Sequence, residues 1–142
     1  MSYEVTKEYV WVGAIPDRPH ELAEKLDALS DAGLNLELIV ARREMPGRAL
    51  LFVSPLRNLE EFEIAENVGL AIQEDIRAIR VTGPDAPGIG SRIAMAISKA
   101  NLNIRGYTAT ALGDRMMVVV AFDNEADADD ALAAVSKELG AA

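Results

Sequence analysis

The sequence contains an internal repeat, and this constrains its fold more than any other feature. At a shift of 68 residues, 15–36 aligns with 83–104 without a gap, and eight of 22 positions are identical. The identical pairs are Pro16/Pro84, Asp17/Asp85, Pro19/Pro87, Ala28/Ala96, Ser30/Ser98, Ala32/Ala100, Leu34/Leu102 and Asn35/Asn103. Several are turn formers or follow a helix-like stretch, so they have defined backbone roles. Duplication of one structural unit explains them better than shared composition does.

Each copy begins with the same two elements. An apolar strand is expected over 9–15 and over 76–82, and each ends in a Pro-Asp-x-Pro turn. Apolar residues at helical spacing follow the turn in both copies. The first helices are expected to end at Gly33 and Asn101, because both residues tolerate a left-handed backbone.

The second half of each copy also has a common order. A strand of alternating polarity leads through a short turn into a continuous apolar run, 49–53 or 116–122, which indicates a central strand. A second helix is then expected, capped near Asn58 in the first copy and near Asp123 in the second. In the first copy its inward face is expected to extend to Ile72.

The order βαββα(β), found twice, predicts an α+β fold of two ferredoxin-like units in tandem, with antiparallel sheets and helices on one face. We expect the units to span 1–74 and 75–142. The fourth strand is not evident in either copy. One solution is strand exchange, in which Tyr3 to Thr6 of the N-terminal stretch adds to the sheet of the second unit.

Composition excludes several classes of function. The 142 residues carry 14 Lys+Arg and 23 Asp+Glu, a net charge of −9, so nucleic acids and anionic membranes are poor partners. The lack of cysteine excludes disulfides, thiol nucleophiles and cysteine-ligated metals. No stretch approaches the roughly 20 apolar residues of a membrane span, and the N-terminus does not resemble a secretion signal. We expect a cytoplasmic protein without cofactor or metal.

The segment Pro84 to Arg92 is the strongest chemical feature, because a glycine-rich turn directly precedes a helix. Free backbone N–H groups at a helix N-terminus attract anions, and Gly88 and Gly90 leave them uncovered. Asp85 or the side chain of Asn103 could accept hydrogen bonds from an ammonium group. A site for a carboxylate next to a site for an ammonium suits a free amino acid. The alternative is purely structural: Asp85 caps the helix, Pro87 starts it, and the glycines permit close packing.

The other candidate residues favour structural roles. His20 has no orienting partner and is interpreted as an exposed turn residue. The acidic run over 123–130 lacks calcium-loop spacing and is interpreted as a solvated face. Trp11, Tyr9 and Tyr107 are expected to be core or interface aromatics. No catalytic set stands out, so a binding module is favoured over an enzyme.

The stretches 84–90 and 100–104, with their counterparts 16–19 and 32–36, resemble the ACT domain signature, and the tandem arrangement is similar to the regulatory half of aspartate kinases. The resemblance implies side-by-side pairing of units and amino acid binding at their interfaces. In the second copy it implies that the ligand contacts Asp85, Ala86, Pro87, Gly88, Ile89, Gly90 and Asn103. In the first copy the matching positions are Asp17, Arg18, Pro19, His20, Glu21 and Asn35, where His20 replaces a glycine and Glu21 adds an opposing charge.

Two functions follow from this resemblance. The first is a stand-alone regulatory protein that senses an amino acid at the turn before the first helix of the second unit and at interfaces between units. It would form a homodimer or higher homo-oligomer and act in trans on a metabolic enzyme. The alternative is an interaction scaffold that uses ACT units for assembly without a ligand. The intact Gly88, Gly90 and Asn103 favour the first function, and the altered first copy supports the second. A ferredoxin-like enzyme of the acylphosphatase type is disfavoured, because no anion-cradling loop with Arg and Asn is present.

Overall fold

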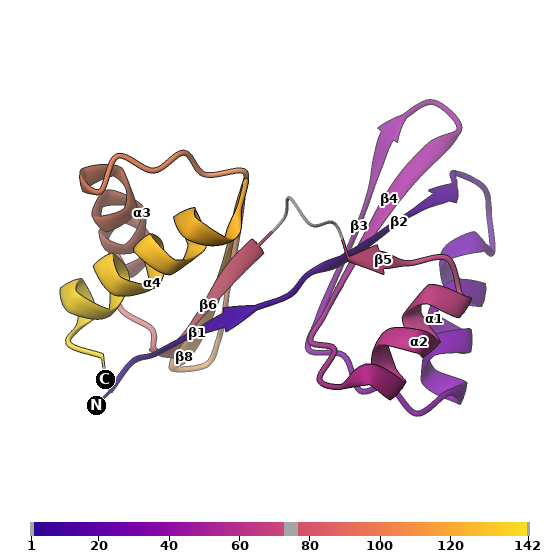
Figure 1. Ribbon diagram of the computed structural model, residues 1–142, viewed down its shortest axis with the longest axis horizontal. Coiled ribbons are helices and arrows are strands. Elements are labelled where there is room, and N and C mark those ends of the chain that lie inside the picture. Colours follow the sequence, from indigo (N-terminus) through magenta and orange to yellow (C-terminus); the bar gives the residue numbers. More distant parts are fainter. Residues whose placement is uncertain (1, 73–76, 142) are drawn as a thin grey trace. The chain divides into compact units, whose positions relative to one another are not determined.

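The computed structural model describes residues 2–72 and 77–141 (Figure 1). The chain divides into two compact units, which are described separately: Tyr9–Gln73, here the first unit, and Met1–Glu8 with Glu74–Ala142, here the second unit. The repeat predicts a boundary at 74/75, so the two divisions differ in the assignment of the first eight residues and of Glu74.

The first unit contains one antiparallel sheet in the order β3-β4-β2-β5, with two helices. Its elements are β2 (Trp11–Pro16), α1 (Glu21–Asp31), β3 (Leu38–Met45), β4 (Arg48–Ser54), α2 (Leu59–Asn67) and β5 (Ala71–Ile72). The buried side chains of β4 alternate with less buried ones, which gives the sheet one face toward the helices.

The second unit repeats this topology in the order β1-β6-β8-β7. Its elements are β1 (Glu4–Glu8), β6 (Arg77–Pro84), α3 (Ile89–Lys99), β7 (Gly106–Leu112), β8 (Arg115–Phe122) and α4 (Glu125–Leu139). Figure 1 shows α3 and α4 on the same side of the strands of this unit. The α+β fold with two antiparallel sheets, expected from the repeat, is confirmed.

The fourth strands come from different parts of the chain. In the first unit β5, only two residues long, follows α2 directly and pairs with β2. In the second unit the equivalent edge is filled by β1, which pairs antiparallel with β6 from Glu4 opposite Thr82 to Glu8 opposite Ala78. The N-terminal strand therefore belongs to the sheet of the second unit, and the first unit is inserted between β1 and β6.

Each unit has its own hydrophobic core between sheet and helices. The core of the first unit contains Trp11, which stacks on Phe62 with ring centroids 5.2 Å apart. The core of the second unit contains Val5 from β1 together with apolar residues of β6, α3, β8 and α4. The fully buried members there include Ile79, Val81, Ile93, Ile97, Val120, Phe122, Ala128, Ala131 and Val135.

Gly33 and Asn101 close the first helices, as the sequence predicted, and each lies two residues beyond the last helical residue. Both residues adopt positive φ, 92° and 60°. The amide of Leu34 then donates to the carbonyl of Leu29, and the amide of Leu102 donates to that of Ile97, as in a Schellman motif. These bonds satisfy carbonyls at the helix ends and turn the chain back toward the sheet.

The second helices differ slightly from the prediction. Asn58 caps α2 as expected, accepting from the amide of Glu61 at 2.9 Å, but Asn124 rather than Asp123 caps α4. Helix α2 ends at Asn67, and Gly69 at φ 90° turns the chain into β5, so Ile72 lies in a strand and not on the helix. The expectation that α2 extends to Ile72 was wrong, because a Schellman turn at Gly69 ends the helix before Ile72 is reached.

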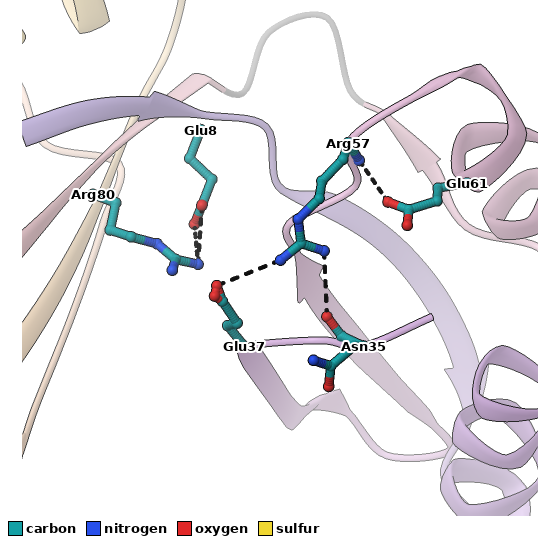
Figure 2. A network of polar contacts seen from close by, with 6 residues as sticks. All are labelled: Glu8, Asn35, Glu37, Arg57, Glu61 and Arg80. Atoms are coloured by element: carbon teal, nitrogen blue, oxygen red, sulfur yellow. Dashed lines mark hydrogen bonds and ion pairs between the residues drawn. The ribbon is translucent and has the colours of Figure 1, made fainter. Parts of the chain in front are cut away.

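Two ion-pair groups hold β1 in the second unit. Lys7 contacts Glu125 at 2.7 Å and Asp129 at 2.8 Å, both on α4, so the acidic run is not solely a solvated face. The hydrogen bonds that Lys7 donates to Asp129 and Glu125, with the opposite charges of these carboxylates, raise the pKa of the Lys7 ammonium above its ordinary value. Arg80 of β6 pairs with Glu8 at 2.9 Å, as Figure 2 shows.

Candidate functional site

The turn before α3 leaves backbone amides uncovered. The amide of Asp85 donates to the carbonyl of Asp114 at 2.8 Å, which fixes the start of the turn against the β7–β8 hairpin. Gly88 is the N-cap residue at φ 82°, and a Cβ there would meet nothing within 4 Å. In the described part of the second unit no side chain caps this helix, so the structural alternative in which Asp85 is the cap is not observed.

A pocket of about 270 Å³ lies beside this turn, within the second unit. One wall is formed by the turn and the start of α3, and the other by strands β7 and β8. The lining residues are Asp85, Ala86, Gly88, Ile89, Gly90, Ala109, Thr110, Ala111, Met116 and Val118. Small residues predominate, so the volume is left open, and Asp85 brings a carboxylate to apolar walls and free amides.

Tyr107 connects the two walls. Its hydroxyl donates to the carbonyl of Gly90 at 2.8 Å, which joins β7 to the first turn of α3. Partial burial raises the pKa of the Tyr107 phenol above its ordinary value, so the hydroxyl remains a donor at neutral pH. A Cβ at Gly90 would lie 3.5 Å from this hydroxyl, which is ordinary contact.

Two of the candidate residues in the second unit do not line the pocket. Pro87 belongs to the turn but is absent from the lining, and so is Asn103, an exposed residue between α3 and β7. The five other candidates, Asp85, Ala86, Gly88, Ile89 and Gly90, all line it.

The turn before α1 in the first unit carries internal ion pairs. The Asp17 carboxylate accepts from Nε of Arg43, and Arg18 pairs with Glu21 at 2.7 Å. His20 is exposed and occupies the N-cap at φ 77°, an uncommon conformation for a residue with a Cβ. The candidates Asp17 and His20 thus lie on one turn, where Asp17 already has a cationic partner.

Asn35 follows α1 and lies apart from these pairs in sequence and in its contacts. Its carbonyl accepts from Nη1 of Arg57 at 3.5 Å, and the same guanidinium contacts Glu37 at 3.6 Å (Figure 2). The amide of Arg57 donates to the Glu61 carboxylate at 2.7 Å. This group therefore ties the start of α2 to the segment before β3.

Several pocket residues were not predicted from sequence. Ala109, Thr110, Ala111, Met116 and Val118 line it, and Tyr107 supports it. The strands were expected, but their small residues carry no chemical signature. The signal that could have found Ala111 is its alignment with Arg43 at the repeat offset, because a large charged residue is replaced by a small one.

Comparison with known proteins identifies the fold. Neither a protein-family model nor a curated protein matches the sequence. Among solved structures, the ligand-free regulatory subunit of aspartate kinase from Thermus thermophilus aligns with 97% of both chains, at 20% identity and a TM-score of 0.68. Protein BT0572 from Bacteroides thetaiotaomicron aligns with 96% of this chain and 89% of its own, at 16% identity and a TM-score of 0.74.

A third similar structure is a putative C-terminal regulatory domain of aspartate kinase from Porphyromonas gingivalis W83, with 96% of both chains aligned, 16% identity and a TM-score of 0.55. The topology and these similar structures give the chain the tandem ACT fold, as the sequence motifs indicated. In particular, the chain has the fold of aspartate kinase regulatory subunits along nearly its whole length.

The described residues, 2–72 and 77–141, contain no cluster of three or more His, Cys, Asp or Glu suited to a metal ion. None of the helices in these ranges has the length and apolar character needed to cross a bilayer.

Proposed function

We propose that this chain is a regulatory protein that binds a free amino acid in the pocket of the second unit. The observation that carries the proposal is the pocket itself, which combines one carboxylate, a helix N-terminus with uncovered amides, and apolar walls. A free amino acid presents the complementary groups: a carboxylate, an ammonium and a side chain. The similarity to regulatory subunits supports the same class of function.

The chemistry of the pocket assigns a place to each group of the ligand. The ligand carboxylate would accept from the amides at the start of α3, where the helix dipole favours negative charge. Its ammonium would lie toward Asp85. Its side chain would contact Ala109, Ala111 and Met116, which favours a small and largely apolar side chain over a charged one.

The second unit also has an edge suited to self-association. Strand β7 stands at the end of its sheet, has no charged residue, and is exposed from Tyr107 to Leu112. The corresponding edge strand of the first unit, β3, carries Arg42, Arg43 and Glu44, which oppose edge-to-edge pairing. A homodimer in which two β7 strands pair would place both pockets next to the new interface, since Ala109–Ala111 line them.

Ligand binding in this arrangement would regulate a partner through the dimer. A ligand that contacts the turn before α3 and the wall formed by β7 would favour one conformation of the interface, by no more than its difference in affinity for the two states. The regulated partner would be a metabolic enzyme bound in trans in the cytoplasm, with the chain itself contributing no catalysis.

An interaction scaffold without a ligand is the second candidate. The first unit favours it, because the ion pairs Asp17–Arg43 and Arg18–Glu21 occupy its equivalent turn. Under this alternative the second-unit pocket would be a remnant, and the protein would associate in the same way with or without amino acids.

A thermal-shift screen against the free amino acids, followed by calorimetric titration of each hit, separates the two candidates. Binding to the native state raises apparent stability by about 2.7 kcal/mol at 100 times the dissociation constant. Gly88→Asp should abolish the shift, because it adds a side chain and negative charge at the turn. Gly47→Asp is the matched control: Gly47 also has positive φ, 85°, and open space within 4 Å.

The proposal requires a selective shift that Gly88→Asp removes and Gly47→Asp leaves. Normal binding by the folded Gly88→Asp variant would place the site elsewhere. No shift with any amino acid would favour the scaffold.

A further inference from the structure

The two turns have the same backbone. The amide of Asp17 donates to the carbonyl of Gly47 at 3.1 Å, as the amide of Asp85 does to Asp114. The amides of Glu24 and Arg92 donate, each at 2.9 Å, to the carbonyls of His20 and Gly88. The N-cap φ values of the two helices, 77° and 82°, agree within a few degrees. Asp17 and Asp85 therefore start from equivalent backbone positions.

The strands beside the turns also correspond. At the repeat offset, β3 residues 41–43 match β7 residues 109–111. Arg43 lies opposite Ala49 in the sheet of the first unit, and Ala111 lies opposite Met116 in that of the second. The hairpin of the first unit has one additional residue, with a register shift between Arg43 and Met45, which comes after the matched positions. The alignment of Arg43 with Ala111 thus holds in structure as well as in sequence.

The side chains at the pocket positions differ in size. Where the second unit has Ala86, Gly90, Thr110 and Ala111, the first unit has Arg18, Leu22, Arg42 and Arg43. Arg43 makes the decisive contact, because its Nε donates to Oδ2 of Asp17. In the first unit the Arg43 guanidinium lies beside Asp17. In the second unit the equivalent space beside Asp85 belongs to the pocket, because Ala111 is too small to fill it.

We propose that Arg43 is a built-in occupant of the first unit, and that its guanidinium fills a cation subsite which in the second unit is left to the cationic group of a ligand at Asp85. The chain then has two copies of one subsite, one closed by its own side chain and one open. The inference deepens the proposed function by identifying the side chain that closes the equivalent subsite in the first unit, and it rests on the proposed pocket but on no particular amino acid.

The open and closed subsites can be distinguished with methylguanidinium as the probe. Methylguanidinium is added to the full chain, and the side-chain carboxyl resonances of Asp17 and Asp85 are followed by NMR. The carboxyl resonance of the exposed Asp31 reports non-specific ion pairing. In the wild type the resonance of Asp85 should shift and saturate, whereas Asp17 should move no more than Asp31. Asp17 should not respond because the guanidinium of Arg43 already contacts its carboxylate.

Two substitutions should exchange these responses. Arg43→Ala opens the first subsite, so Asp17 should respond to the probe at concentrations similar to those for Asp85. Ala111→Arg supplies the second unit with the missing guanidinium, so Asp85 should stop responding. The controls are Arg42→Ala, which removes the same charge from the adjacent residue, and Leu112→Arg, which adds it at a residue 86% exposed and outside the pocket lining.

The inference fails if Asp17 responds in the wild type as Asp85 does, or if Arg43→Ala leaves Asp17 unresponsive while the amide spectrum shows a folded chain. It also fails if Ala111→Arg leaves the response of Asp85 unchanged. Because methylguanidinium is not an amino acid, this result is independent of the amino acid screen. The exchange pattern can hold when no amino acid binds, and an amino acid can bind when the pattern is absent.

Discussion

The hydroxyl of Tyr107 donates a hydrogen bond of 2.8 Å to the carbonyl oxygen of Gly90, so one side chain of β7 fixes the first turn of α3. The first unit has no equivalent bond at these positions, because Ile39 and Leu22 stand there. Only the unit with the open pocket has its two walls joined in this way.

Tyr107→Phe should weaken ligand binding without unfolding the chain. A neutral hydrogen bond contributes about 1 kcal/mol, so we expect a dissociation constant raised about fivefold for the amino acid that stabilises the wild type. Calorimetric titration of both proteins gives the comparison. Equal affinities would show that the Tyr107 bond is irrelevant to the pocket. Tyr9→Phe in the first unit is the control for loss of a tyrosine hydroxyl.

Alkaline pH should affect the same bond. Partial burial raises the pKa of Tyr107 in the folded state above the ordinary value of 10.0, so the native state holds this proton more tightly than the unfolded state does. Its contribution to stability is fully present below pH 10 and is lost as pH rises through the raised pKa. Denaturant titrations of the wild type and Tyr107→Phe should therefore converge above pH 10, and parallel curves over that range would contradict this assignment.

His20→Gly should stabilise the first unit. His20 holds a left-handed backbone at φ 77° with an exposed side chain, and relief of that conformation outweighs the added flexibility of glycine by about 0.5 to 1 kcal/mol. Trp11 is the sole tryptophan and lies buried in the core of this unit, so its fluorescence during denaturant unfolding reports the change. A lower midpoint would mean that the imidazole contributes more than its backbone costs.

Lys7→Met should loosen β1 from α4. It removes two exposed ion pairs, to Glu125 and Asp129, each contributing about 0.5 kcal/mol or less. Since the pKa of Lys7 is raised, this contribution is present at neutral pH and disappears only above pH 10.5. Hydrogen exchange of the β1 and β6 amides should quicken in the variant at low salt and approach the wild-type rate at high salt. Lys99→Met, on α3, is the control for loss of one positive charge.

Thr108→Lys should shift the association equilibrium toward monomer. Thr108 is exposed on the uncharged edge strand β7, and a lysine there opposes pairing of two such edges. Light scattering across a concentration series measures the effect, which we expect to be at least tenfold in the dimer dissociation constant. Thr6→Lys adds the same charge on β1, the other edge of the sheet, and should leave association unchanged. Equal effects of the two variants would argue against a β7 interface.

The helices were predictable because local chemistry defines their ends. Gly33 and Asn101 adopt the left-handed conformation that their residue types favour, and Asn58 caps α2 as its position suggested. The strand pairing was harder to predict. Strand β5 has only two residues and no periodicity to detect. The pairing of β1 with β6, about seventy positions away, is encoded by no local pattern, and it was anticipated only as one way to supply the missing fourth strand.

The site was predictable on one side only. The turn at Asp85–Gly90 has a recognisable glycine-rich sequence, and these residues line the pocket except for Pro87. The opposite wall consists of alanines, a threonine and apolar strand residues, which are equally common where there is no pocket. Its role depends on the open space beside Asp85, where Ala111 stands in place of the arginine that the first unit has at Arg43. The strand sequence by itself does not encode this difference.

The insertion of the first unit between β1 and β6 has a consequence for synthesis on the ribosome. Strand β1 is translated before the first unit, but β6, its hydrogen-bonding partner, is not translated until the whole of the first unit has been made. Domains generally fold as units, the N-terminal one first, so the first unit can fold while β1 is still without its partner strand. In the nascent chain, β1 therefore reaches its final place only after the first unit and β6 have been made.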